Sequence, residues 1–376
     1  MPEWRVPLSD VVYEDGEIEA VADTYRSGWI SMGPRTEELE ARFTEYTGAA
    51  HAVAVTNCTA GLHLSCLAAG LGEGDEVIVP SLTFIATVNA IRYTGATPVF
   101  ADVAGLERPW LSHAAAESLV GERTMAIMTM SYGGYPGETA ELSRLAADRG
   151  LILLEDAAHG LGGRLDGRHL GTFGRAGAYS FFSNKNLPVG EGGLVVTDDD
   201  EFAERLRLLR SHGMTSLSWD RHRGHAHGYD VVALGFNYRI DEPRAALAAR
   251  RLARLDADNG RRGELVNSYR ARLEQVDGAT PTLPPVEGWE PAHHLFSVVL
   301  AEGIDRDGVR QALAEQGVQT SLHYPPAHRF SIYADGQPPL PLTEAYAERA
   351  VTLPLFPHMS EAQLELVVDS LSDALG

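Results

Sequence analysis

The residues with the clearest chemical potential lie in the stretch Ala178–Gly193, which contains Lys185. The 31 lysines and arginines of the chain comprise 30 arginines and this single lysine. Arginine stays protonated and offers no free amine, whereas a partly desolvated lysine can lose its proton and form a Schiff base with a carbonyl. A lone lysine can also remain on a surface by chance. The apolar run before Lys185 and the glycine-rich turn after it favour a reactive amine.

A second candidate is Asp156, which follows the apolar run 151–155. A carboxylate at this place can merely mark where solvent begins, or it can be held ionised against a cationic ring nitrogen. A lysine Schiff base together with an aspartate that faces a pyridinium nitrogen is typical of pyridoxal phosphate sites. Asp156 precedes Lys185 by 29 residues, enough chain for one hairpin or crossover. The pair therefore raises the hypothesis of such a site.

Three further side chains each allow a structural and a functional interpretation. Thr59 lies in the loop Thr56–Gly61, where a small hydroxyl residue is usually a helix N-cap, but where helix N–H groups can also bind a phosphate. Ser180 can be a satisfied strand hydroxyl or a phosphate donor. Phe84 opens a predicted helix, and such an aromatic residue is more often core than a platform for a ligand ring.

These residues need elements that bring them together, and the hydrophobic pattern predicts strands alternating with helices up to residue 211. Such alternation predicts a mostly parallel sheet covered on both faces, with ligands beyond the carboxyl ends of its strands. The loops after residues 55, 79, 129 and 155 are then the candidate positions. The predicted strands are 51–55, 76–79, 97–101, 124–129, 151–155, 178–182 and 193–197, and the predicted helices are 17–28, 36–47, 59–70, 83–93, 112–119, 138–149 and 199–211.

The second half of the chain predicts a loop, a long helix and a smaller domain. Residues 212–230 are rich in histidine and arginine but lack the spacing of a helical metal-ligand pair. We therefore predict a mobile polar loop that covers the site, and not a metal site. Residues 241–274 predict one long helix, and the prolines between residues 281 and 291 mark a boundary. Strands at 295–300, 318–322 and 351–355, with helices at 306–316, 343–350 and 360–374, predict a small α+β domain.

Composition excludes several classes of protein. A chain of 376 residues, 44% hydrophobic and 22% charged, predicts two packed domains with a large core. The formal net charge of −21 argues against nucleic acid or an anionic membrane as a partner. The sequence contains no long apolar run and no apolar stretch of the signal-peptide kind at its start, and Cys58 and Cys66 are too far apart on one helix to bridge. We therefore expect a cytoplasmic, reduced protein.

Motifs of other enzyme classes fail. The glycines after His159 lack the dinucleotide-binding spacing, and neither a P-loop nor the hydrolase Gly-x-Ser-x-Gly elbow occurs. No zinc-binding pattern is found, so no metal is expected.

Several stretches together resemble the DegT/DnrJ/EryC1/StrS family of nucleotide-sugar aminotransferases over nearly the whole chain. They are Ser27–Pro34, Thr59–Leu64, Gly74–Phe84, Glu155–His159, Tyr179–Gly193, Gly235–Arg239 and Leu353–Leu355. The resemblance implies the α/β fold of type I pyridoxal-phosphate enzymes, as in aspartate aminotransferase. It places a large cofactor-binding domain, with an N-terminal arm, at residues 1–250 and a small α+β domain at 251–376.

The resemblance also implies a role for each matching residue. Lys185 would carry pyridoxal 5'-phosphate as an aldimine and move the proton, with pyridoxamine phosphate as the intermediate form. Asp156 would pair with the pyridinium nitrogen. The other cofactor contacts would be Thr59, Ala60 and Ser180 to the phosphate, Phe84 stacked on the ring, His159 near the ring hydroxyl and Asn237 from the second subunit of a homodimer. Arg239 and His328 would contact the substrate. Cys58 departs from the small serine or glycine that relatives commonly have.

The implied reaction moves an amino group from glutamate or glutamine to a nucleotide-linked keto sugar. The stretches Ser27–Ile30 and Asp156–His159 resemble enzymes that aminate C4 of a 4-keto-6-deoxy hexose, so dTDP-4-keto-6-deoxyglucose is the expected substrate. The use of arginine in place of lysine suggests a GC-rich genome and a deoxyamino sugar of a secondary metabolite. A 3-keto-sugar or cyclitol aminotransferase remains open, as does an idle sugar-nucleotide sensor, although Lys185 and Asp156 argue against the sensor.

Overall fold

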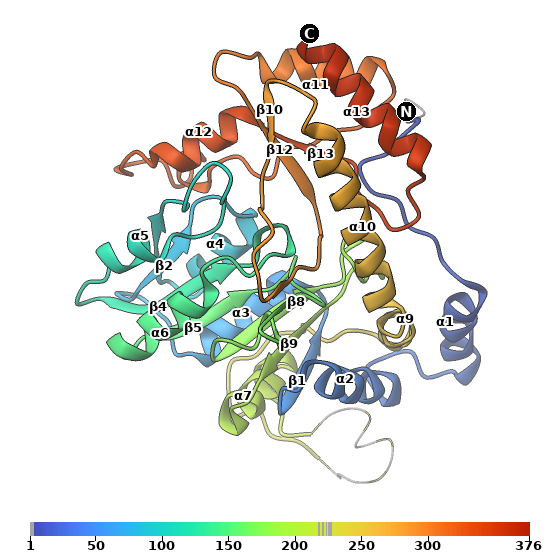
Figure 1. Ribbon diagram of the computed structural model, residues 1–376. Helices are drawn as coiled ribbons and strands as arrows, with labels where there is room; N and C mark the ends of the chain where they lie inside the picture. Colours follow the sequence, from blue (N-terminus) through green and yellow to red (C-terminus); the bar gives the residue numbers. More distant parts are fainter. Residues whose placement is uncertain (1–3, 217–218, 220–221, 223, 225–227) are drawn as a thin grey trace.

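The computed structural model describes residues 4–216, 219, 222, 224 and 228–376. Within these residues, the centre is a seven-stranded sheet in the order β1-β9-β8-β5-β4-β2-β3 (Figure 1). Strands β8, β5, β4, β2 and β3 are parallel, and β9 is antiparallel to both of its neighbours. The mostly parallel sheet predicted from the sequence is confirmed. The strands are β1 (His51–Val55), β2 (Glu76–Pro80), β3 (Thr97–Ala101), β4 (Thr124–Met130), β5 (Ile152–Asp156), β8 (Ala176–Ser180) and β9 (Gly193–Thr197).

Helices cover both faces of this sheet because successive strand residues point to opposite sides. Val77 and Val79 pack with helices α3 (Cys58–Ala68), α4 (Ile85–Arg92) and α7 (Asp200–Arg210), whereas Ile78 packs with α5 (His113–Ser118) and α6 (Thr139–Arg149). Helices α2 (Pro34–Thr47) and α9 (Glu242–Leu252) cover the second face near β1 and β9. The result is a three-layer α/β/α arrangement.

Several helices begin at a side chain that caps their first N–H groups. Asn57 accepts from the backbone N–H of Ala60 at the start of α3, and Asp199 and Asp241 do the same for α7 and α9. A buried carboxylate, that of Glu242, accepts the N–H groups of Gly33, Arg35 and Thr36 at the start of α2. It thereby fixes the end of the loop Ser27–Gly33.

The C-terminal part has a core of its own. A three-stranded sheet, β10-β12-β13, packs with helices α10, α11 and α13. The N-terminal segment joins it, since the N–H of Val6 donates to Gly317 O and Val6 bridges Val318. The segment around Val6 and the C-terminal helix α13 therefore lie at the same end of the molecule (Figure 1). The bounds are β10 (Ala279–Pro281), β12 (Phe296–Leu300), β13 (Ala350–Leu353), α10 (Leu255–Leu273), α11 (Arg306–Glu315), α12 (Pro341–Arg349) and α13 (Glu361–Leu375).

The single long helix predicted over 241–274 is wrong, because the chain breaks into α9 and α10 at Ala253 and Arg254. Leu252 and Leu255 pack in the core under the large sheet, whereas Leu265 packs in the small-domain core. The break redirects the chain so that α10 runs from one core to the other (Figure 1). The domain boundary predicted after residue 250 stays a prediction.

The strand predicted at 318–322 is also wrong. Val318 pairs only with Val6 of the N-terminal segment, and Ser321 makes a single bridge to Thr352. Within the described residues, the backbone pairing of this stretch is limited to these isolated bridges, so it does not form a strand. The helix predicted at 17–28 is confirmed as α1 (Asp15–Ser27). Short strands that the sequence did not predict are β6 (Arg164–Leu165), β7 (Arg168–His169) and β11 (Trp289–Glu290).

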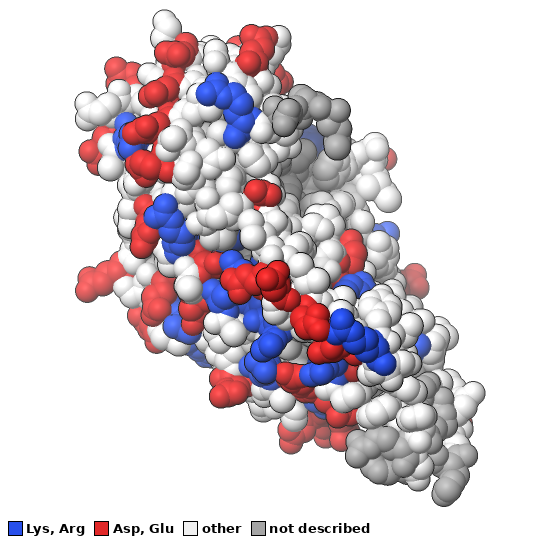
Figure 2. Space-filling model, turned by 90° about the vertical axis from the view of Figure 1, so that its right-hand side faces the viewer, with Lys and Arg blue, Asp and Glu red and all other residues white. Residues whose placement is uncertain are grey.

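Of the polar side chains predicted to form a loop over the site, Arg221, Arg223, His225 and His227 lie outside the described residues. Elsewhere in this stretch, Met214 bridges Val231 in an antiparallel manner. Within the described residues, no helix combines the length and apolar character required to cross a bilayer. On the side of the molecule that carries α1 and α10, acidic and basic side chains are interleaved (Figure 2).

Candidate active site

A large pocket lies where three parallel strands end. The last residues of β4, β5 and β8 (Met130, Asp156 and Ser180) all line it, as expected for ligand sites of parallel sheets. Its volume is about 1030 Å³, at the upper end of the range for small-molecule sites. The helix start after β1, the turn around Lys185 and the C-terminal stretch Ser321–Tyr324 complete the wall.

Lys185 lies in the connection between β8 and β9, and its backbone N–H donates to Phe182 O at 2.9 Å. The turn holds the side chain against the pocket wall. Burial lowers the pKa of the Lys185 amine to about 8, while the negative charge of Asp156 acts in the opposite direction. Roughly a tenth of the amine is therefore unprotonated at pH 7, which is the form that a nucleophile requires.

Asp156 is 3% exposed and ends β5. Its Oδ2 accepts from the Thr87 hydroxyl at 2.6 Å, and its Oδ1 accepts from the backbone N–H of Ala158 at 3.0 Å. Burial raises the pKa of this carboxyl, and the two hydrogen bonds act against that rise. The group is a buried carboxylate that can accept a further proton donor from the pocket.

The start of α3 presents backbone N–H groups to the same pocket. Asn57 caps the helix through the N–H of Ala60, and the first-turn N–H groups of Cys58 and Thr59 have no acceptor inside the helix. The N-cap is thus Asn57 and not a hydroxyl residue. The Ser180 hydroxyl accepts from the N–H of Phe182 at 3.3 Å, which leaves its own proton to donate. This end of the pocket suits an anion.

Aromatic and imidazole rings form the opposite wall. Phe84, at the N-cap of α4, is 53% exposed and lies with its ring centroid 5.8 Å from that of Tyr324. His159 is 1% exposed; its Nδ1 accepts from the N–H of Gly133 at 3.3 Å, and its Nε2 lies 2.9 Å from the Tyr324 hydroxyl. Burial keeps the pKa of His159 well below its usual value, so the ring is neutral.

Three predicted residues lie away from this pocket. Asn237 is exposed and bridges Ser211, and Arg239 is half-buried with its pKa lowered by burial. His328 is fully buried: its Nδ1 lies 2.6 Å from the Ser81 hydroxyl and its Nε2 3.0 Å from Glu344 Oε1. The substrate contact of His328 stays a prediction; in this structure its ring contacts Ser81 and Glu344 and helps hold the segment at 327–329 inside the protein.

The sequence model of the DegT/DnrJ/EryC1/StrS aminotransferase family matches residues 12–372. The chain belongs to this family. Solved structures agree over the whole molecule. The aminotransferase TlmJ from Streptoalloteichus hindustanus is 33% identical with a TM-score of 0.93, and the match covers 98% of each chain.

Two further solved structures bear on the chemistry. DesV from S. venezuelae, in complex with a ketimine intermediate, is 37% identical with a TM-score of 0.87, over 95% of this chain and 93% of that one. Spr1654 from Streptococcus pneumoniae, in its PMP form, is 27% identical with a TM-score of 0.92, over 98% and 99%. The chain is thus a sugar aminotransferase of the DegT/DnrJ/EryC1/StrS family, with the fold of type I pyridoxal-phosphate enzymes, and the family implies pyridoxal phosphate as its cofactor.

The pocket of this aminotransferase fits pyridoxal phosphate at separate points. The α3 start and Ser180 offer donors for a phosphate, and Asp156 is a buried acceptor for a protonated ring nitrogen. Phe84 offers an exposed ring face, and the Lys185 amine is near its deprotonation point.

Other site residues were missed from the sequence. Tyr324, His323 and His294 come from the C-terminal third, and Thr87 lies one turn into α4. A signal was present for some of them: a histidine pair directly precedes the apolar run 295–300, and a His-Tyr pair precedes two prolines. Neither pattern says that its side chains lie close to Lys185 or His159.

Proposed function

We propose that this enzyme transfers an amino group from glutamate or glutamine to C4 of dTDP-4-keto-6-deoxyglucose, in the biosynthesis of a deoxyamino sugar for a secondary metabolite. The observation that carries the reaction type is the convergence of Lys185, Asp156 and the start of α3 on one pocket. The choice of sugar is supported by the stretches Ser27–Ile30 and Asp156–His159. The free, buried state of Cys58 and Cys66 agrees with the cytoplasmic location that we propose.

In this proposal Lys185 is the attachment point of the cofactor and the group that moves the proton between the reacting carbons. When bound, pyridoxal phosphate supplies an electron sink for the charge that develops at those carbons. Asp156 would hold the ring nitrogen protonated, and the Thr87 hydroxyl stabilises the charge of Asp156 by a hydrogen bond. Thr59, Ala60 and Ser180 would hold the phosphate, Phe84 would contact the ring face, and the neutral His159 would stand beside the ring hydroxyl together with Tyr324.

The proposed active unit is a homodimer in which Asn237 reaches the phosphate of the other subunit, with Arg239 nearby as a substrate contact. Support comes from the exposed apolar side chains just before Asn237, since Val231 is 55%, Val232 58% and Leu234 91% exposed. Apolar side chains gathered in this way are typical of protein–protein contacts. Light scattering of the purified protein should therefore give twice the chain mass, and a monomer with full activity would refute this part of the proposal.

The first test is the replacement of Lys185. Lys185→Ala should abolish turnover but still bind pyridoxamine phosphate, and Lys185→Arg should fail equally although it keeps the charge. Purified wild-type protein should be yellow and should bleach when glutamate is added, as measured by visible absorbance. Substantial transaminase activity of Lys185→Ala would falsify the assignment.

The second test concerns the substrate. Amination of 3-keto and 4-keto nucleotide sugars, and of a keto cyclitol, should be measured side by side with both amino donors. We expect the 4-keto-6-deoxy sugar to have the highest kcat/KM. A preference for a 3-keto sugar or a cyclitol would replace the proposed substrate and leave the reaction type intact. A colourless protein that stays colourless with added cofactor would favour the sensor.

A further inference from the structure

The Lys185 amine has a neighbour that the proposed roles do not use. Its Nζ lies 3.4 Å from Nε2 of His294, which belongs to the segment between β11 and β12 and is 9% exposed. His294 does not line the large pocket; together with Lys185 it lines a separate cavity of about 20 Å³. The histidine therefore contacts the amine from outside the space that the substrate would occupy.

Hydrogen bonds fix which nitrogen of His294 carries the proton. Asn186 Nδ2 donates to Ala292 O at 2.7 Å and to Asn259 Oδ1 at 2.8 Å, so the amide oxygen of Asn186 is the atom that faces His294. That oxygen lies 2.9 Å from His294 Nδ1, which must therefore donate. In a neutral ring, Nε2 then has a lone pair available for a Lys185 N–H.

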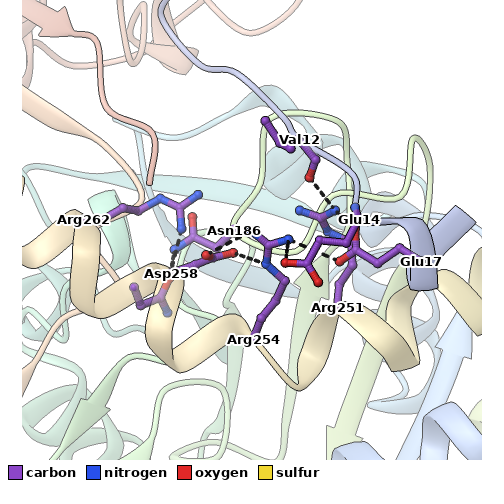
Figure 3. A network of polar contacts seen from close by, with 9 residues as sticks. Val12, Glu14, Glu17, Asn186, Arg251, Arg254, Asp258 and Arg262 are labelled. Carbon is purple, nitrogen blue, oxygen red and sulfur yellow. Dashed lines mark hydrogen bonds and ion pairs between the residues drawn. The ribbon is translucent and has the colours of Figure 1, made fainter. Parts of the chain in front are cut away.

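The chain of donors continues to α10. Asn259 donates from Nδ2 to Leu161 O at 3.1 Å, and its Oδ1 also accepts from Arg262 at 3.3 Å. Asn186, Asn259 and Arg262 are each at most 7% exposed. Figure 3 shows Asn186 beside the arginine-rich face of α10, where Arg254 pairs with Asp258. Each residue of this hydrogen-bonded series has a partner, so the His294 ring has little freedom to flip.

We propose that His294 is a positioning residue, whose Nε2 accepts a hydrogen bond from the Lys185 amine and so directs the nitrogen lone pair into the large pocket. The proposal rests on the proposed role of Lys185 as the attachment point. Asn186 has the supporting task of keeping His294 in the tautomer with the proton on Nδ1. His294 accepts no proton itself, because it holds the amine in either charge state by the same lone pair.

The charge of the surroundings supports this assignment. The titratable groups that act on the amine or are acted on by it are Asp156, Cys58, His159, His294 and His323. Burial and the neighbouring positive charges keep the pKa of His294 well below its usual value, and burial lowers that of His323 to about 3. The three histidines are therefore neutral at working pH, and the Nε2 lone pair is available.

The single lysine permits a direct test on the full chain without cofactor. An amine-selective acylating reagent can modify only Lys185 and the chain's amino terminus, and mass spectrometry of the Lys185 peptide gives its modification rate against pH. A neutral acceptor favours the ammonium form, so His294→Phe should lower the pKa of Lys185 by about half a unit to one unit, roughly a threefold to tenfold change in the amine-to-ammonium ratio. The rate at which added pyridoxal phosphate is captured, followed by absorbance and divided by the fraction of unprotonated amine, should fall in this variant because the lone pair is no longer directed into the large pocket.

Other variants separate positioning from packing. His294→Gln keeps an acceptor oxygen at similar reach and should restore both the pKa and the capture rate towards the wild-type values. Asn186→Leu should act in the same direction as His294→Phe, because it frees His294 to take the other tautomer. The matched control is His293→Asn, which removes the adjacent histidine, whose Nδ1 contacts the Tyr135 hydroxyl at 3.0 Å, and should leave Lys185 unchanged.

An unchanged pKa of Lys185 in folded His294→Phe, or equal effects of His294→Phe and His293→Asn, would overturn the inference. If His294→Phe does not fold, the pKa of Lys185 is compared between His294→Gln and Asn186→Leu. Equal pKa values in these two variants would overturn the inference. Failure of the proposed function looks different: wild-type protein would then not capture pyridoxal phosphate at all, whatever the pKa of its lysine.

Discussion

At the scale of single residues, the Thr87 hydroxyl contributes most to keeping Asp156 ionised against the effect of burial. Burial raises the pKa of this carboxyl, and the Thr87 hydroxyl is the largest of the influences that lower it again. Thr87 is in turn held by Thr83, whose Oγ1 lies 2.7 Å from that of Thr87. The chain Thr83–Thr87–Asp156 therefore keeps the carboxylate charged inside the protein.

Removal of the Thr87 hydroxyl should show this dependence. Thr87→Val keeps the shape of the side chain and raises the pKa of Asp156 further, so the active carboxylate is lost at a higher pH as pH falls. The acidic limb of the kcat profile should move upwards by about one unit, and kcat should drop roughly tenfold, as expected for one hydrogen bond to a charged group. Thr83→Val, which does not touch the carboxylate, is the control with a smaller shift. Coincident acidic limbs for Thr87→Val and wild type would contradict the argument.

The residues predicted from sequence and those missed differ in a physical way. Lys185 and Asp156 could be found because a single lysine and an acidic end of an apolar strand are local signals. Tyr324 and His294 come from the other side of the site, more than a hundred residues after Lys185. Their contacts with Lys185 and His159 depend on how segments far apart in the chain pack together. No short sequence pattern predicts such packing.

At the scale of elements, Glu155 shows how β5 holds the chain that follows it. Its carboxylate is 1% exposed and accepts the N–H groups of Gly171 at 2.8 Å and Gly174 at 2.7 Å. It thereby ties residues 171–174 to the strand that carries Asp156. Burial, partly opposed by these hydrogen bonds, raises the pKa of Glu155 to about 7.

The raised pKa predicts a loss of stability as pH rises. An unfolded glutamate ionises near 4.5, so between that value and 7 the folded state binds more protons than the unfolded state. The stabilisation is complete below 4.5 and is lost up to about pH 7, amounting to about 3 kcal/mol. Glu155→Gln should remove this contribution, as measured by urea unfolding at pH 5 and pH 7.5. A wild-type and a variant curve with the same pH dependence would exclude Glu155 as the cause.

The elements themselves show where hydrophobic patterning is sufficient. The seven strands of the large sheet were each predicted to within about two residues, because each is a short apolar run bounded by turn residues. The break between α9 and α10 could not be predicted in this way, since the chain there has neither glycine nor proline. The helix is broken at a point where the side chains on either side pack in different cores, Leu252 in one and Leu265 in the other.

At the scale of the whole molecule, the N-terminal segment connects the two cores. Val6 pairs with Gly317 and Val318, and helix α1 is joined to α9 by an ion pair between Glu17 and Arg251 at 2.8 Å. Both side chains of this pair are at most 6% exposed (Figure 3). A buried pair of this kind becomes costly when one partner is removed, because the other charge stays buried.

Glu17→Gln should therefore destabilise the protein by about 3 kcal/mol, with the loss appearing first as release of the arm. The double variant Glu17→Gln with Arg251→Met should recover most of the stability, because no charge is then left unpaired. Thermal unfolding and limited proteolysis near residue 12 measure the two effects. Equal stability of the single and the double variant would show that the pair acts through something other than charge.

The segment at 327–343 bears on how a sugar nucleotide can enter. It follows the pocket residue Tyr324 in the chain, and three of its side chains, those of Ala327, Tyr333 and Leu340, are buried in the core that also contains Val77 and Val79. Asp102 also accepts the backbone N–H of Thr343 at 2.7 Å. Tyr333 also donates to Asn89 of α4 at 2.6 Å. A hinge that swung Tyr324 outwards would have to break these contacts. Entry of the sugar nucleotide should therefore depend on the width of a pocket entrance that stays open. A change of sugar preference should come from substituting side chains that line the pocket, and not from altering a moving lid.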